Sequence, residues 1–228
     1  IDAVEVSDTE ERGVLIDDSD EVLVSRSHLH HTGRVSPLLA EGIAVDTASN
    51  IRDNEAVYVT ANRIHHTGFS EAVHVNTNVF NSVVRANFVH SVELGIMGQD
   101  VFNMGAISIE PGVSPDGDDE HRVLDRREVW VKDNLILHVA LGRWGNGVHA
   151  GGTGVTVAGN TIDNAEEAGI LLNSFGNMGH TVFLDDNTIT NTDASMRIEG
   201  GVTFQLGALT TTPPVDTFSF WDCSVENP

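Results

Sequence analysis

Residues 155–162 read Val-Thr-Val-Ala-Gly-Asn-Thr-Ile, and this order of apolar and polar residues returns along most of the chain. The unit is apolar-x-apolar-x-x-(Asn/Ser)-x-apolar, and one looser copy has Ser82 in its first apolar slot. The Asn or Ser positions of its six copies are Ser27, Asn62, Asn87, Asn134, Asn160 and Asn187.

A second apolar signal lies between these copies, and a glycine often introduces it. It reads Gly13-Val14-x-Ile16, Gly42-Ile43-x-Val45, Val73-x-Val75, Gly147-Val148 and Gly169-Ile170-x-Leu172. For the interval after Asn87 there are two candidates, Gly95-Ile96 and Ile107-x-Ile109, and Arg197-Ile198 is a weaker final copy.

Apolar residues that alternate in short runs predict strands with one inward face, because a helix needs a period near 3.6. One such coil cannot bury its inner face alone, so coils stack at about 4.8 Å per step. We expect the asparagines to form one column at a bend, where a short polar side chain bonds backbone groups and tolerates left-handed geometry. This predicts an all-β, single-stranded parallel β-helix of about seven to eight coils. It covers residues 1–206 with an irregular loop at 98–128, and residues 207–228 form a C-terminal tail or cap.

The repeated pattern resembles the pectate-lyase-like, right-handed β-helix superfamily and its parallel β-helix repeat members, over roughly residues 4 to 204. The resemblance implies a right-handed solenoid. It leaves the function open, because this scaffold carries lyases, hydrolases, epimerases, adhesins and phage tail fibres.

The chain has 34 acidic and 12 basic side chains, and its net charge is −22. Such a surface repels nucleic acid and suits cations, although it also fits a merely solubilising role. No apolar run approaches the length of a membrane span. The single Cys223 excludes an intrachain disulfide.

The chain begins at Ile1 with neither an initiator methionine nor a signal peptide, and no segment resembles the cap that closes a solenoid. We therefore expect a processed chain that is secreted or on the cell surface and lacks its N-terminal cap. An open end of this kind would permit a homo-oligomer or a larger assembly.

Stacking converts sequence positions into rows on the surface. The residue between the two apolar positions of the strand that opens each coil is Leu15, Ala44, His74, Ser108 (or Met97), His149, Leu171 and, less surely, Glu199. The next row after the strand is Asp17, Asp46, Asn76, Glu110 (or Gln99), Gly151 and Asn173.

We expect His74, Glu110 and His149 to supply a base and an acid, because imidazole and carboxyl groups transfer protons near neutral pH. Asn76, Ser108, Trp144 and Asn173 are expected to contact substrate, with the Trp144 ring stacking on sugar. The alternative is that these are ordinary outward residues on a polar face.

Two further groups of residues could act as metal ligands. Three residues after the Asn or Ser of the first three copies come His30, His65 and His90, and His-His-Thr-Gly repeats at 30–33 and 65–68. This row predicts a packed side-chain ladder, a metal site after adjustment, or a low-pH switch. The loop residues Asp116, Asp118 and Glu120 offer alternate carboxylates for calcium, or form a solvated loop.

Two function classes remain. One is an extracellular polysaccharide-interacting β-helix, including a lyase, hydrolase or epimerase acting on glycan along the parallel face, with calcium as its cofactor. The other is a non-catalytic structural or adhesive module of a surface, appendage or tail fibre.

Overall fold

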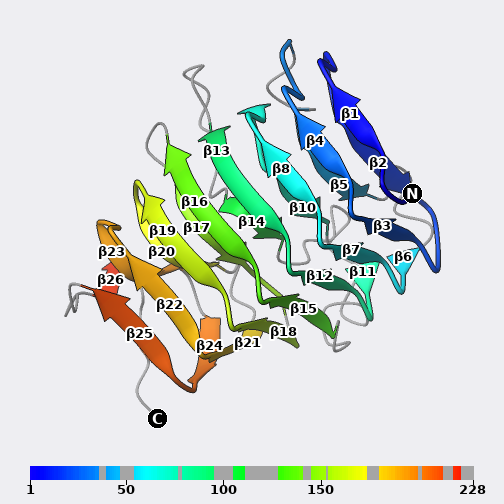
Figure 1. Ribbon diagram of the computed structural model, residues 1–228. Coiled ribbons are helices and arrows are strands. Elements are labelled where there is room, and N and C mark those ends of the chain that lie inside the picture. Colours follow the sequence, from blue (N-terminus) through cyan, green and yellow to red (C-terminus); the bar gives the residue numbers. More distant parts are fainter. Residues whose placement is uncertain are drawn as a thin grey trace.

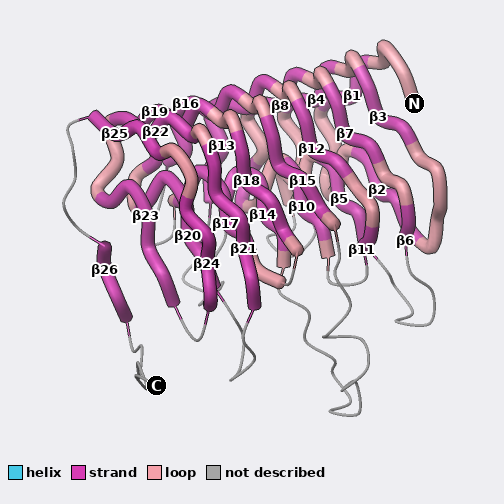
Figure 2. Tube along the Cα trace, turned by 90° about the horizontal axis from the view of Figure 1, so that it is seen from below, coloured by secondary structure: helices cyan, strands magenta, loops and turns pink. Residues whose placement is uncertain are grey.

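A computed structural model describes residues 1–35, 40–46, 54–76, 79–94, 105–110, 128–140, 145–152, 154–173, 180–199, 202–212 and 218–221. Within these ranges the chain forms strands and turns and no helix. Accordingly, no helix of the described residues could cross a membrane. Figures 1 and 2 show the strands stacked side by side from the N-terminal to the C-terminal end of one elongated solenoid.

Three long sheets, all parallel, run along the solenoid, and the chain visits them in the repeating order C, A, B. Sheet C is 8-stranded and contains β2 (Val14–Asp17), β5 (Ile43–Asp46), β10 (Val73–Val75), β14 (Gly105–Ile109), β17 (Asn146–Ala150), β20 (Ala168–Asn173), β23 (Ala194–Glu199) and β26 (Phe218–Trp221). Sheet A is 7-stranded and contains β3 (Leu23–Ser25), β7 (Tyr58–Thr60), β12 (Val83–Arg85), β15 (Val129–Lys132), β18 (Val155–Ala158), β21 (His180–Asp185) and β24 (Val202–Leu206).

Sheet B is 9-stranded. Its path contains β1 (Glu5–Ser7), β4 (His28–His30), β8 (Arg63–His65), β13 (Phe88–Leu94), β16 (Leu135–Ala140), β19 (Thr161–Ala165), β22 (Asn187–Thr190) and β25 (Leu209–Thr212), and β9 (Gly68–Phe69) pairs with β13. A small 2-stranded sheet joins β6 (Asn54–Glu55) to β11 (Val79–Phe80). The predicted parallel β-helix of about seven to eight coils is confirmed.

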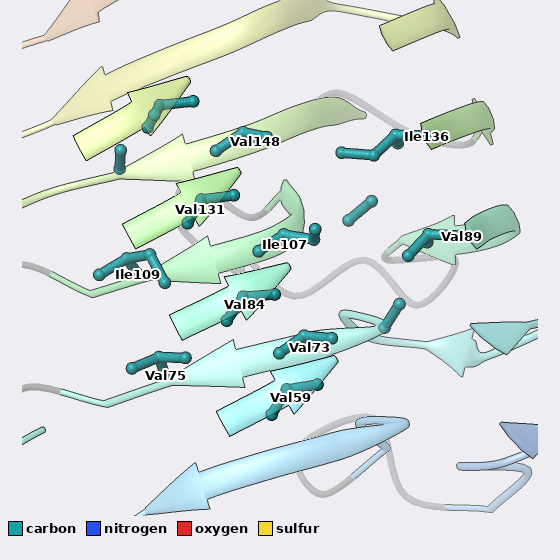
Figure 3. Packing of buried hydrophobic residues seen from close by; sticks show 14 of the residues in the cluster. Val59, Val73, Val75, Val84, Val89, Ile107, Ile109, Val131, Ile136 and Val148 are labelled. Carbon is teal, nitrogen blue, oxygen red and sulfur yellow. The ribbon is translucent and has the colours of Figure 1, made fainter. Parts of the chain in front are cut away.

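The inward residues of the three sheets form one continuous apolar core. Val59, Val84 and Val131 stack in one column of sheet A (Figure 3). Val73, Ile107 and Val148 do the same in sheet C, and Val89 and Ile136 lie in sheet B. These side chains are at most 2% exposed, and burying each one stabilises the fold by roughly 1.5–3 kcal/mol.

The predicted asparagine column is present and buried. Each amide Nδ2 donates to the Oδ1 of the asparagine in the next coil, at 3.1, 3.0, 2.9 and 2.9 Å from Asn62 to Asn187. Each Nδ2 also donates to a sheet A carbonyl oxygen of the preceding coil, as Asn134 does to Val84. The left-handed residue at this bend is the one before the Asn or Ser of each copy: Arg26, Ala61, Ala86, Asp133, Gly159 and Asp186.

The glycine at the start of sheet C strands is explained by packing against sheet B. A Cβ on Gly147 would lie 2.5 Å from Cγ2 of Ile162, and one on Gly169 would lie 2.4 Å from Cγ2 of Ile189. Those isoleucines are the last residues of the Asn-x-Ile copies. The two halves of the repeat therefore contact each other where sheet B packs against the start of the sheet C strands.

Strand pairing also bears on two segments that the repeat leaves open. Of the two candidates for the strand in the interval after Asn87, Ile107-x-Ile109 is the one that forms β14, inside the segment 98–128. The segment 207–228 was expected to be a tail or cap, but it supplies β25 and β26, which extend sheets B and C. Parallel pairing continued past residue 206 although the apolar alternation had faded.

Candidate functional site

The middle of sheet C brings three of the predicted site residues into one row. His74 pairs with Ser108, and Ser108 pairs with His149. The row continues from Ala44 on one side to Leu171 on the other, as predicted. Its next member is Arg197 and not Glu199, which instead pairs with Asn173.

The row is not the open polar face that was expected. Ser108 is 0% exposed and His149 2% exposed, although each alternates with core residues along its strand and so belongs to the outward row. The His74 side chain keeps 14% of its surface exposed, and that of Glu110 keeps 39%. Access from solvent to this cluster is therefore at His74 and Glu110.

His74 lies between two carboxylates. Its Nδ1 is 3.6 Å from Oε1 of Glu71, which is three residues earlier in the same coil, and its Nε2 is 3.9 Å from Oε1 of Glu110 in the next coil. Glu71 is 1% exposed and accepts a short hydrogen bond from the Ser70 hydroxyl.

These carboxylates hold a proton on His74. Burial by itself disfavours the charged ring, but the hydrogen bond and charge of Glu71, with Glu110 and Glu41, raise the pKa of His74 to about 9. Burial would raise the pKa of Glu71, but its bonds to His74 and Ser70 lower that pKa below its ordinary value. At neutral pH the pair is an imidazolium beside a carboxylate.

His149 has the opposite protonation state. Burial lowers the pKa of His149 to about 4, so the ring is neutral at pH 7. Its Nδ1 shares a hydrogen bond of 2.8 Å with Oγ of Ser108, and its buried Nε2 has no hydrogen-bond partner among the described residues. One row thus holds a charged and a neutral imidazole, with Ser108 between them.

A network of polar side chains lies on the N-terminal side of His74. Arg12 donates to Oε2 of Glu41 at 2.9 Å and to Oδ2 of Asp46 at 3.2 Å. Asn76 donates to Oδ1 of Asp46 at 2.6 Å, and the predicted adjacency of Asn76 to Glu110 is present in the register.

Glu41 and Glu71 were missed because only the strands and the positions after them were considered. Both precede the small residue that opens a sheet C strand, Gly42 and Ala72, and Arg12 precedes Gly13 in the same column. This shared position, directly before the small residue at the start of a sheet C strand, is the sequence signal that could have identified Glu41 and Glu71.

One ligand atom from each of Glu41, Glu71 and His74 lies within 4.8 Å of the others, a spacing that a metal ion could bridge. However, Arg12 already pairs with Glu41, and the protonated ring of His74 pairs with Glu71. Protons and the guanidinium thus satisfy this cluster, and a metal would have to displace the proton of His74.

The other predicted site residues do not join this cluster in the described part of the chain. Asn173 is 4% exposed and follows Leu172 in β20, with Gly151 between it and Glu110 in the row. Trp144 and the predicted calcium ligands Asp116, Asp118 and Glu120 lie outside the described residues.

The fold and the site define a parallel β-helix with a histidine–carboxylate cluster on one sheet. No protein-family model matches the sequence, and no curated protein or solved structure matches it significantly.

Proposed function

We propose that this chain is an extracellular carbohydrate-interacting β-helix that cleaves or rearranges glycan at sheet C, with His74 as proton donor and Glu110 as base. The observation that carries the proposal is the position of the His74 ring, beside buried Glu71 and next to the partly exposed carboxylate of Glu110. Groups with separated pKa values in one site are the usual basis of acid–base catalysis. The resemblance to the pectate-lyase-like superfamily, whose members commonly bind glycan on this face, supports the same reading.

The chemistry is a paired proton transfer. The Glu110 carboxylate takes a proton from a sugar carbon next to a carboxyl group, or from a water molecule. The glycosidic C–O bond breaks with its electrons on oxygen, and Nε2 of His74 gives that oxygen its proton. Elimination leaves an unsaturated sugar end, whereas hydrolysis leaves a saturated reducing end.

Ser108 and His149 are buried, so in this proposal they hold the neighbouring coil in place beside His74 instead of contacting the sugar. Asn76, Asn173 and Trp144 are proposed sugar contacts. The net charge of −22 favours neutral glycan, or polyuronate bridged by calcium. A calcium site at Asp116, Asp118 and Glu120 remains a prediction, as do secretion and assembly through the N-terminal coil.

The test is digestion of a polysaccharide panel with and without EDTA, measuring reducing ends and ultraviolet absorbance of unsaturated ends. We expect His74→Gln and Glu110→Gln to abolish product formation, and His138→Gln on sheet B to leave it unchanged. Glu71→Gln should move the alkaline limb of kcat/KM from near pH 9 to lower pH, because His74 loses the carboxylate that holds its proton. No new ends on any glycan would overturn the catalytic proposal.

The burial of Ser108 and His149 favours the second candidate, a non-catalytic surface, appendage or tail-fibre module. In that case the cluster only stabilises the coils. Two results would support this module. Its biological function should be unchanged after His149→Ala and Glu110→Ala, and the chain should bind glycan without releasing products.

A further inference from the structure

The outer face of sheet B near the N-terminal end gathers six histidines. In register, His30 pairs with His65 and His65 pairs with His90, and their rings stack with centroids 5.3 and 4.5 Å apart. His31 stacks on His66 at 5.0 Å, and His28 lies beside both His30 and His65. The predicted row of His30, His65 and His90 is thus confirmed. The strands that carry it, β4, β8 and β13, are neighbours in Figure 1, and β1, which carries Glu5, lies beside β4.

Backbone geometry brings consecutive histidines to the same side. Successive residues of a strand point to opposite faces, so His31 and His66 would ordinarily point away from His30 and His65. Both take left-handed conformations, with φ of 53° and 51°, which break the alternation at the strand end. As a result Nδ1 of His30 lies 2.8 Å from Nδ1 of His31, and Nδ1 of His65 lies 2.6 Å from Nδ1 of His66.

Ring nitrogens and one carboxylate converge at the edge of this array. Nε2 of His28 is 2.7 Å from Nε2 of His65, and Nε2 of His30 is 3.1 Å from Oε1 of Glu5. One ligand atom from each of Glu5, His28 and His30 lies within 4.8 Å of the others. Two nitrogens bound to one ion at about 2.1 Å are about 3.0 Å apart at a right angle and about 3.4 Å apart at the tetrahedral angle. The nitrogens of His28 and His65 therefore need to separate by only a few tenths of an ångström, and the 3.1 Å between His30 and Glu5 is already close to this spacing.

The donor set at the edge of the array, ring nitrogens with one carboxylate oxygen, suits transition metals. Neutral imidazole is a ligand for zinc, copper and nickel ions, whereas calcium prefers oxygen ligands. Glu5 is exposed, so the edge of the array is open to solvent, and the strongly acidic chain attracts cations.

We propose that this face binds a divalent transition-metal ion through Glu5, His28 and His30, with His65 as a further ligand. The site lies on sheet B and is independent of the proposed chemistry at sheet C. Either one can fail without the other.

The experiment is isothermal titration of the chain, carrying no histidine tag, with Cu²⁺, Ni²⁺, Zn²⁺ and Ca²⁺ in turn. We expect each transition metal to bind at one saturable site. Calcium should not bind at this site and should not displace a bound transition metal. His28→Gln and His30→Gln should each weaken binding at least about tenfold. The bound Cu²⁺ should show nitrogen hyperfine splitting in its electron paramagnetic resonance spectrum, and this signal should be reduced in the same variants.

The matched control is His138→Gln, an exposed sheet B histidine that bonds Asn164, and it should bind as the parent does. Glu5→Gln provides a second test if a histidine variant does not fold, because Glu5 is exposed. This variant should also bind the metal measurably more weakly than the parent chain. The proposal is overturned if no transition metal binds, if His28→Gln and His30→Gln bind with parental affinity, or if calcium displaces the metal from this site.

Discussion

Oγ of Ser108 and Nδ1 of His149 form a hydrogen bond of 2.8 Å between adjacent coils of sheet C. Both residues are buried, so this bond is shielded from water and fixes the ring beside the residues that surround His74. Because the bond joins coils whose sequences are far apart, it links the candidate site to the stacking register.

Replacing Ser108 with alanine should lower the free energy of unfolding by about 1–3 kcal/mol, since Nδ1 of His149 is left buried without its partner. Ser195→Ala is the matched control, because Ser195 is also a buried serine of sheet C and its hydroxyl has no partner among the described residues. Urea denaturation of both variants measures the difference. Equal losses would show that the Ser108 bond contributes nothing.

The pair of His74 and Glu71 should make the fold sensitive to alkaline pH. The folded pKa of His74 is about 9, above the model-peptide value of 6.5, so the stabilisation is complete below pH 6.5 and is lost as pH rises through 9. The loss is about 3 kcal/mol. We expect it in urea denaturation of the parent chain and not of His74→Gln, and a loss of equal size in both would contradict this assignment.

The centre of the asparagine column should be the most sensitive polar position in the fold. Asn134→Ala removes bonds to Asn160 and to the carbonyl oxygen of Val84, and it leaves the backbone N–H of Asn87 without an acceptor. We expect a loss of about 3 kcal/mol in the free energy of unfolding. Asn191→Ala, at an exposed turn, should cost less than about 1 kcal/mol, and a similar cost for the two would argue against a structural column.

The contact between Gly147 and Ile162 predicts a coupled pair. Gly147→Ala should destabilise the fold by about 1–3 kcal/mol, because the new methyl group meets Cγ2 of Ile162. Adding Ile162→Ala should give less than the sum of the two single losses, although the nearby carbonyl oxygen of Gly169 keeps part of the clash. Gly145→Ala, whose new methyl group would lie no closer than 3.1 Å to another atom, should be milder. Additive losses in the thermodynamic cycle would contradict the packing.

The class of fold followed from the sequence, because each coil repeats the same physical requirement. Apolar alternation followed by an asparagine recurs at Asn134, Asn160 and Asn187, so the strands, the column and the row of His74 and His149 could be predicted. For the member between them the sequence left Ser108 and Met97 open, and the register selected Ser108. Stacking in register is what makes such local patterns sufficient.

Only the tertiary structure decided burial and protonation. The sequence placed Ser108 and His149 on an outer face, but their exposure depends on neighbours that no repeat encodes. The charge on His74 likewise depends on Glu71, a turn residue outside the repeat, and on Glu110 from the next coil. Periodicity fixes which residues share a row, whereas a pKa is set by everything within a few ångströms, and that exists only after the coils have packed.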